Sequence, residues 1–316
     1  MNSTRRLNKY MKTTGLIFLF VLTVLDCSDG QENQVFPTLP FSLETAIERG
    51  YNKASISIRF YQKEEEDESG YPWSTPIDNG YRVQAFDFSD GKMRSITDYL
   101  PNGNQAKQLI YYYKGDLCGA IDEVYPSVYE GRDSVACTHF FIYDQYNQPF
   151  QKVSQYTCER NFRVLFDYAF DKEKRMTRER VRPVGKIQKT RNIRAIGDKQ
   201  QNQITLTEYR HNAEIRRVYK DLHHILATYH TYLDEYGNPT ETEIQNADRE
   251  AIAIIDYDYE GKRLVQKHFY NPRLQEGEGK LVKRIYYSWN EEGLIGRELI
   301  EEGNRQTILE YTYFSD

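Results

Sequence analysis

The sequence predicts a mainly all-β protein, an antiparallel β-meander of repeated hairpins preceded by one short helix. Residues 251–271 show the unit: apolar and aromatic residues alternate with polar ones up to Tyr259, Gly261 turns the chain, and a second alternating run leaves from Leu264. The 316 residues include 27 Tyr and 15 Phe, which favour strands and bury a large area each. The same outline recurs along the chain, which indicates one repeated-hairpin domain.

The N-terminus has the layout of a secretory signal over residues 1–26. Basic residues precede an apolar run over 15–25, and Cys27 follows one residue later. Eleven apolar residues are too few for a spanning helix, which needs about 20. Met11 is an alternative start, because it leaves a charged stretch directly before the apolar run.

The segment 23–30, Thr-Val-Leu-Asp-Cys-Ser-Asp-Gly, resembles a bacterial lipobox followed by the acidic positions of some exported lipoproteins. This resemblance implies a lipid on Cys27, and an ordinary secreted protein with an unmodified or disulfide-bonded Cys27 is the alternative. Residues 27–40 have the composition of a tether, with Pro37 and Pro40 opposing helix. We therefore expect an exported protein, anchored to the outer membrane and facing the periplasm or the cell surface.

The repeated-hairpin domain is predicted to span residues 41–316 and to begin with a helix over 43–49, ended by Gly50. A first strand over 54–61 leads into the acidic run 63–68. Five consecutive acids there could bind a cation, but we interpret them as a solvated loop.

Ten further strands follow, separated by turns with Gly, Asn or charged residues. Glycine and asparagine adopt positive φ at little cost, and an Asp or Asn just before them can bond the turn backbone. Tyrosines two apart share a face, either packed in the sheet or forming a platform for carbohydrate. The expected strands are 81–88, 93–100, 108–113, 139–143, 164–170, 204–209, 225–233, 252–259, 282–289 and 307–314.

A short pattern, Tyr-Asp-x-x-Gly, recurs in variant form at 233–237, 257–261 and 289–293. It resembles the tyrosine-aspartate repeats of Rhs-type bacterial surface proteins. The resemblance covers residues 81–316 loosely and implies strands and hairpins wound into an extended sheet or shell. It implies architecture and no activity.

Export would place Cys118, Cys137 and Cys158 in an oxidising compartment. A two-residue turn at Asn147 and Gln148 would put Cys137 directly opposite Cys158, so a disulfide between them is one hypothesis. A three-residue turn with a left-handed Asn147 would separate them.

Two groups of residues resemble functional sites, one a metal site and the other a catalytic pair of carboxylates. His223, His224 and His230, with His211 and His268 nearby in sequence, match no standard zinc spacing. Asp256 and Asp258 share a strand face, as a glycosidase pair would, but any such pair in a strand does so. We interpret both groups as surface residues and expect no catalytic, cofactor or metal site. The basic run 172–194 could be an edge that binds a polyanion or a lipid headgroup, but we interpret it as a solvated loop or a long twisted hairpin.

The net charge of −5 and pI near 5.8 argue against a nucleic-acid partner. The sequence thus predicts a non-catalytic cell-envelope lipoprotein that contacts a membrane through its lipid and binds a glycan or a protein. An envelope polysaccharide hydrolase and a structural or toxin-neutralising interaction protein are the alternatives.

Overall fold

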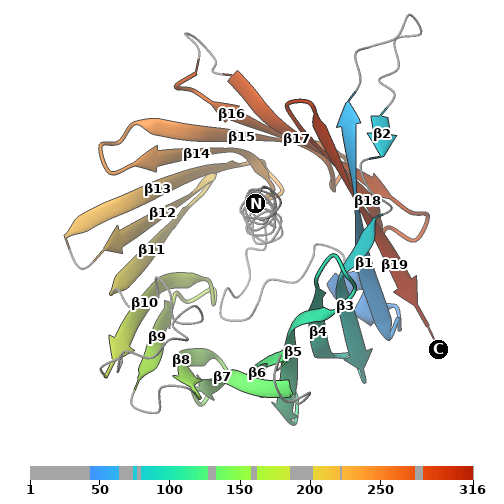
Figure 1. Ribbon diagram of the computed structural model, residues 1–316. Coiled ribbons are helices and arrows are strands. Elements are labelled where there is room, and N and C mark those ends of the chain that lie inside the picture. Colours follow the sequence, from blue (N-terminus) through green and yellow to red (C-terminus); the bar gives the residue numbers. More distant parts are fainter. Residues whose placement is uncertain are drawn as a thin grey trace, which may run out of the picture.

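The computed structural model describes residues 43–63, 74–76, 80–126, 133–157, 162–185, 202–220, 223–274 and 280–315, which form one antiparallel sheet closed into a barrel (Figure 1). Strand β1 (Lys53–Lys63) pairs with β19 (Arg305–Phe314) on one side and with β3 (Tyr81–Ser89) on the other. These pairings close a ring of 18 strands, and the short β2 (Ser74–Pro76) pairs with the end of β1. The predicted all-β class and meander are confirmed.

Each remaining strand pairs with its neighbours in sequence, as a meander requires. Their bounds are β4 (Lys92–Tyr99), β5 (Gln105–Lys114), β6 (Leu117–Pro126), β7 (Asp133–Tyr143), β8 (Pro149–Tyr156), β9 (Arg163–Phe170), β10 (Met176–Val184), β11 (Gln203–Arg210), β12 (Ala213–Lys220), β13 (His224–Leu233), β14 (Pro239–Asn246), β15 (Ala251–Glu260), β16 (Arg263–Asn271), β17 (Lys280–Trp289) and β18 (Ile295–Glu302).

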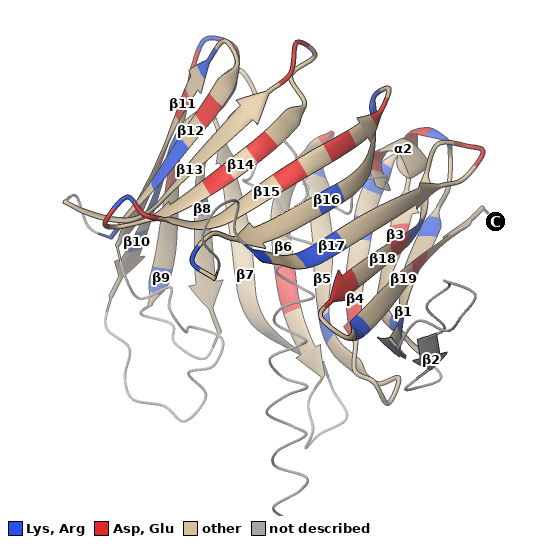
Figure 2. Ribbon diagram, turned by 90° about the horizontal axis from the view of Figure 1, so that it is seen from above, with Lys and Arg blue, Asp and Glu red and all other residues tan. Residues whose placement is uncertain are grey.

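The predicted helix is α2 (Leu43–Glu48), which lies at one end of the barrel (Figure 2). Its Leu43 and Ala46 side chains are buried against the sheet. Gly50 ends it with a φ of +84°, a conformation that glycine adopts without strain. Within the described residues, no helix is long and apolar enough to cross a membrane.

The hairpin turns use the chemistry that their sequences predict. In the turn after β17, the Asn290 Oδ1 accepts hydrogen bonds from the backbone N–H of Glu292 (3.1 Å) and Leu294 (2.9 Å), while Gly293 has a φ of +71°. The Asp234 turn after β13 repeats this arrangement. These turns are specified locally, which explains why the hairpins are legible in the sequence.

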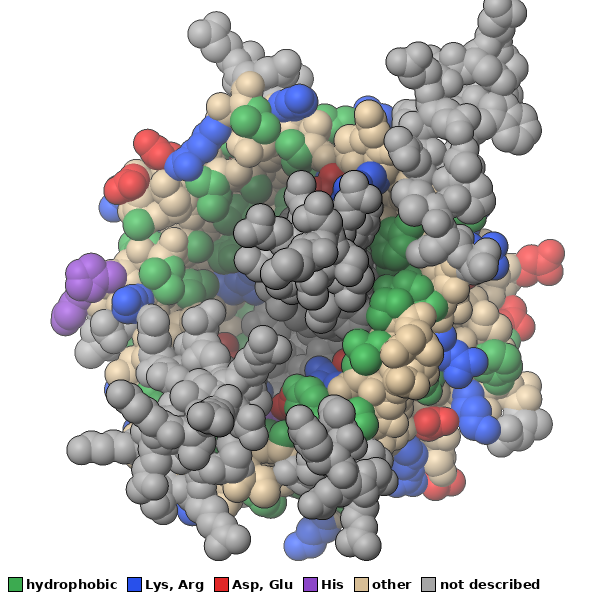
Figure 3. Space-filling view, viewed as in Figure 1, with side chains coloured by type: hydrophobic (Ala, Val, Ile, Leu, Met, Phe, Trp, Pro, Cys, Tyr) green, Lys and Arg blue, Asp and Glu red, His purple; other side chains and the backbone are tan. Residues whose placement is uncertain are grey.

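Side chains alternate between the two faces of the wall. The most buried apolar positions, among them Ile56, Phe86, Ile121 and Leu309, belong to one hydrophobic cluster. Figure 3 shows apolar side chains gathered along the inner edge of the ring. Residues in register with these positions therefore face the inside of the barrel, and the intervening residues face out.

The strand predictions agree with the structure, but two features were not foreseen. The sequence predicts a continuing loop over 71–76, where the structure has β2, and it left open whether the sheet edges close on each other. Part of the basic run 172–194 forms β10. The signal, the tether with Cys27, residues 64–68 of the acidic run and Cys158 lie outside the described residues.

Candidate functional site

Six successive strands each place one polar side chain on the inside of the wall, and we call this set the inner polar band. The Gln84 Nε2 on β3 donates to the Asp98 Oδ1 on β4 (2.9 Å), and the Lys107 Nζ on β5 lies 3.4 Å from the Asp98 Oδ2. The band continues on β6, β7 and β8. Its members are Gln84, Asp98, Lys107, Glu123, His139 and Ser154.

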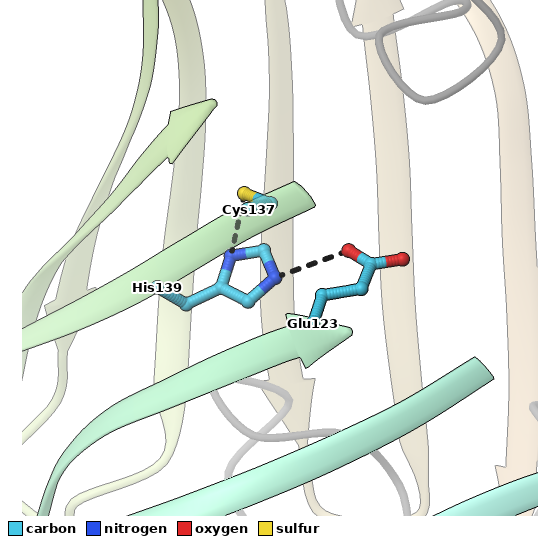
Figure 4. Close-up of side chains that lie close together, drawn as sticks. All are labelled: Glu123, Cys137 and His139. Atoms are coloured by element: carbon cyan, nitrogen blue, oxygen red, sulfur yellow. Dashed lines mark hydrogen bonds and ion pairs between the residues drawn. The ribbon is translucent and has the colours of Figure 1, made fainter. Parts of the chain in front are cut away.

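The centre of the band is His139, whose two ring nitrogens face different partners (Figure 4). Its Nε2 lies 3.5 Å from the Glu123 Oε2, and its Nδ1 lies 2.7 Å from the Ser154 Oγ and 3.9 Å from the Cys137 Sγ. The Tyr125 hydroxyl donates to the other Glu123 oxygen, Oε1, at 2.7 Å. Cys137 and Ser154 are buried, so this cluster lies within the wall.

The Glu123 carboxyl is held in its charged form. Burial by itself would raise its pKa, but the hydrogen bonds from His139 and Tyr125 and the charge of Lys107 outweigh burial and lower the pKa to about 2. At neutral pH the cluster therefore contains a fixed negative charge beside the imidazole.

The sheet register brings these donors together. Glu123 is directly opposite Cys137, and His139 is two residues further along β7 on the same face. The Cys137 sulfur, a His139 nitrogen and a Glu123 oxygen lie within 4.8 Å of one another, so these residues could hold one metal ion.

The inner wall also carries tyrosine hydroxyls with unmet hydrogen-bonding capacity. Tyr111 on β5 and Tyr168 on β9 are 7% and 6% exposed, and neither hydroxyl has a hydrogen-bond partner in the described part of the chain. By contrast, the Tyr143 hydroxyl donates to the Cys118 carbonyl oxygen at 2.6 Å. A buried hydroxyl without a partner is costly, so these two mark a place where a polar group from outside the chain could bind.

A second inner cluster lies on the opposite arc of the ring. Lys267 on β16 and Lys283 on β17 are buried beside aromatic rings, with the Lys267 Nζ 5.3 Å from the centre of the Tyr257 ring. The Tyr311 hydroxyl donates to the Glu298 Oε1 at 2.5 Å. Burial raises the pKa of Glu298, while Tyr311 and the two lysines oppose that rise. The inner wall thus combines charges with aromatic faces.

The structure separates the residues that the sequence singled out. Tyr156, and not Cys158, is opposite Cys137, so the two-residue register behind the disulfide hypothesis is wrong. Asn147 has a φ of +62°, as in the alternative turn that separates the two cysteines. Because Cys158 lies outside the described residues, the disulfide itself stays a prediction.

The histidine group and the aspartate pair that the sequence singled out lie on the outer face. His230 is opposite Glu243, and Asp256 is opposite His268, all at outward positions. Asp258 is exposed in the same row. The structure places none of these side chains on the inner wall.

Sequence reasoning missed the inner polar band. Its one local signal is Cys137-Thr-His139, an i, i+2 pair that shares a strand face. The remaining members come from other strands and meet only through the register. A sulfur, an imidazole and a carboxylate in line also resemble a nucleophile relay, but Cys137 is 0% exposed, whereas reactive catalytic cysteines are at least partly exposed.

No protein-family model and no curated protein matches this chain. Among solved structures, it is similar to a porin-like protein from Bacteroides uniformis, with a TM-score of 0.41 and 9% identity over 84% of this chain and 96% of that one. It is also similar to a porin-like protein from Bacteroides vulgatus, with a TM-score of 0.29 and 8% identity over 73% and 98% of the two chains. A LolA superfamily protein from Nitrosomonas europaea has a TM-score of 0.21 and 10% identity over 85% and 90%. At these TM-scores the similarities carry no argument about function, which must come from the residues.

Proposed function

We propose that this protein is a non-catalytic, exported module of the cell envelope that binds a glycan against its inner wall. The observation that carries the proposal is the pair of buried hydroxyls of Tyr111 and Tyr168 on the inner wall, which have no hydrogen-bond partner among the described residues. A sugar offers hydroxyl groups that could pair with them and apolar ring faces that could stack on neighbouring aromatic residues. The inner polar band adds donors and acceptors of the kind that fix a sugar's orientation.

The outer face supports a position in water beside the membrane. It carries ion pairs between strands, such as Arg59 with Glu310 and Arg217 with Glu208, each at 3.4 Å. An outward Arg would cost about 2 to 4 kcal/mol at the middle of a bilayer. We therefore propose that a lipid on Cys27 holds the protein to the outer membrane while the barrel stays outside the lipid.

The hydrolase alternative finds less support. Burial raises the pKa of both Glu179 and Glu214 on the inner wall, as a catalytic acid requires. However, Glu179 is paired with Thr205 on β11, and Glu214 is paired with Tyr209 on the same strand. The two glutamates are therefore offset by four residues along the strands, which is about 13 Å. Glycosidase carboxyl pairs are at most about 9.5 Å apart. These two carboxyls therefore do not converge on one bond.

A glycan array on the soluble 31–316 fragment, followed by calorimetry on any ligand found, tests the glycan proposal. We expect Tyr111→Phe and Tyr168→Phe each to weaken binding at least about fivefold, the loss of one hydrogen bond. Tyr112→Phe is the matched control, because Tyr112 faces outward and is 48% exposed. Equal loss in the control, or unchanged binding in both inner variants, would contradict the proposal.

The anchor has its own test. Cells expressing wild type or Cys27→Ala are labelled with a fatty acid and fractionated. We expect label and membrane association only in the wild type. Unlabelled wild-type protein in the soluble fraction would remove the anchor.

A protein partner is the second candidate function, favoured by an outer apolar patch. Tyr112, Phe140, Ile142 and Phe150 are 39% to 48% exposed on β5, β7 and β8. Contiguous apolar side chains on a surface often mark a protein interface. Co-purification of a defined partner that is lost in Phe140→Ser with Ile142→Ser, but kept in Leu226→Ser, would favour this function.

The kinship with tyrosine-aspartate repeats also remains a proposal. Its support is the turn chemistry, since the Asp234 turn coincides with one of the three matching segments and the Asn290 turn with another.

A further inference from the structure

We propose that Glu123, Cys137 and His139 form a binding site for a transition-metal ion of the zinc class. The three residues supply an oxygen, a sulfur and a nitrogen donor, all within 4.8 Å of one another. They sit on the paired strands β6 and β7, whose register fixes their backbone positions before any ion arrives. This inference does not depend on the glycan proposal.

The spacing of the nitrogen and oxygen donors suits one ion. The His139 Nε2 and the Glu123 Oε2 are 3.5 Å apart. A tetrahedral zinc ion with bonds of about 2.0 to 2.1 Å holds its nitrogen and oxygen ligands roughly 3.3 Å apart. The Cys137 Sγ lies within 4.8 Å of the other two donor atoms and would have to move closer, to the spacing of roughly 3.5 Å that a sulfur ligand needs.

The supporting contacts leave the right atoms available. The Ser154 Oγ holds the His139 Nδ1 at 2.7 Å, so the ring presents Nε2 toward Glu123. The Tyr125 hydroxyl holds the Glu123 Oε1 at 2.7 Å, which leaves Oε2 for an ion. Metal-binding imidazoles and carboxylates are commonly oriented by such outer contacts.

The donor set selects the class of ion. Calcium and magnesium take oxygen ligands, whereas a sulfur and an imidazole favour zinc and neighbouring divalent ions. Two anionic ligands, a thiolate and a carboxylate, would neutralise a divalent charge inside the wall. Three protein ligands leave a fourth position for water or a ligand group.

The test uses the full-length chain, purified and stripped of metal, then titrated with Co²⁺ and followed by absorption. We expect one equivalent to bind with a sulfur-to-cobalt charge-transfer band, and Zn²⁺ to displace it. Cys137→Ser should abolish the band. Glu123→Gln, which keeps the side-chain shape, should weaken affinity at least about tenfold, and Ser154→Ala should weaken it by about 10 to 100-fold.

Cys118→Ser is the matched control, because Cys118 is also buried but its Sγ contacts the Ala120 carbonyl oxygen on the neighbouring stretch of β6. Circular dichroism checks that each variant retains its sheet. Absence of stoichiometric binding, or a band that persists in Cys137→Ser, would overturn the proposal. So would a Cys137–Cys158 disulfide in the purified protein, because a bridged sulfur cannot bind the ion as a thiolate.

Discussion

Tyr111 and Tyr143 lie on the inner wall two strands apart, and one hydrogen bond distinguishes them. The Tyr143 hydroxyl has a carbonyl partner, while the Tyr111 hydroxyl has none in the described chain. Burial raises the pKa of both hydroxyls, so both are neutral donors at physiological pH. The inner wall thus contains a hydroxyl that could still form a hydrogen bond, which is useful in a binding surface and unfavourable in a stable core.

Substitution by phenylalanine distinguishes the unpaired Tyr111 hydroxyl from the hydrogen-bonded Tyr143 hydroxyl. Tyr111→Phe removes an unsatisfied hydroxyl, so we expect the free energy of unfolding in urea to stay the same or rise by up to about 1 kcal/mol. Tyr143→Phe breaks a made bond and should lower it by about 1 kcal/mol. If Tyr111→Phe proves as destabilising as Tyr143→Phe, the Tyr111 hydroxyl has a partner within the protein.

Glu123 makes stability depend on pH. Its pKa is about 2 in the fold against 4.5 ordinarily, so its charged form stabilises the fold by about 3 kcal/mol above pH 4.5. This contribution is lost as the pH falls from 4.5 toward 2, and roughly 2 kcal/mol should be gone at pH 3.

Urea unfolding at pH 6 and pH 3 measures the contribution of the Glu123 charge to the free energy of unfolding. The difference between wild type and Glu123→Gln should shrink at pH 3, while Glu291→Gln, an exposed turn residue, should track the wild type at both values. A constant difference would show that Glu123 is not held charged by His139, Tyr125 and Lys107.

The hairpin is the element that the sequence specifies best. Asn290 bonds two backbone N–H groups across its turn, and buried Leu294 and Ile295 follow directly. Such turns are read from five neighbouring residues. Register is different, because bulges such as those at Glu123/Val124 and Ile142/Tyr143 shift which residues face each other.

The register shifts at bulges explain which features could be predicted from the sequence and which could not. Strands and turns follow from local patterns, so they were foreseen. The pairing of Cys137 with Tyr156 depends on the register of β7 with β8, and the meeting of Glu123 with His139 depends on the register of β6 with β7; both registers contain a bulge. No local signal in the sequence specifies them.

Asn290→Ala tests the turn. Loss of its two hydrogen bonds should lower the free energy of unfolding by about 1 to 2 kcal/mol, comparable with loss of a helix cap. Asn290→Asp keeps an acceptor oxygen and should retain most of the stability. Thermal unfolding of both variants beside Glu291→Ala provides the comparison, and equal losses in Ala and Asp variants would assign the effect to something other than the accepted bonds.

At the scale of the whole molecule, closure of the sheet into a barrel gives it an enclosed inner face. β1 pairs with β19 over ten residue pairs, from Lys53 with Phe314 to Gln62 with Arg305. No exposed sheet edge then remains between the first and last strands, which removes a site for aggregation. Both the inner polar band and the proposed metal site depend on this closure, because an open sheet would leave that face in solvent.

Cross-linking of the first and last strands tests closure most directly. Ser55 and Thr312 are paired across β1 and β19, so Ser55→Cys with Thr312→Cys should form an intramolecular disulfide on mild oxidation. Peptide mass spectrometry should find β1 joined to β19 in monomeric protein, with neither single variant giving that product. Absence of the link in folded monomer, or its appearance only between two chains, would contradict the closed barrel.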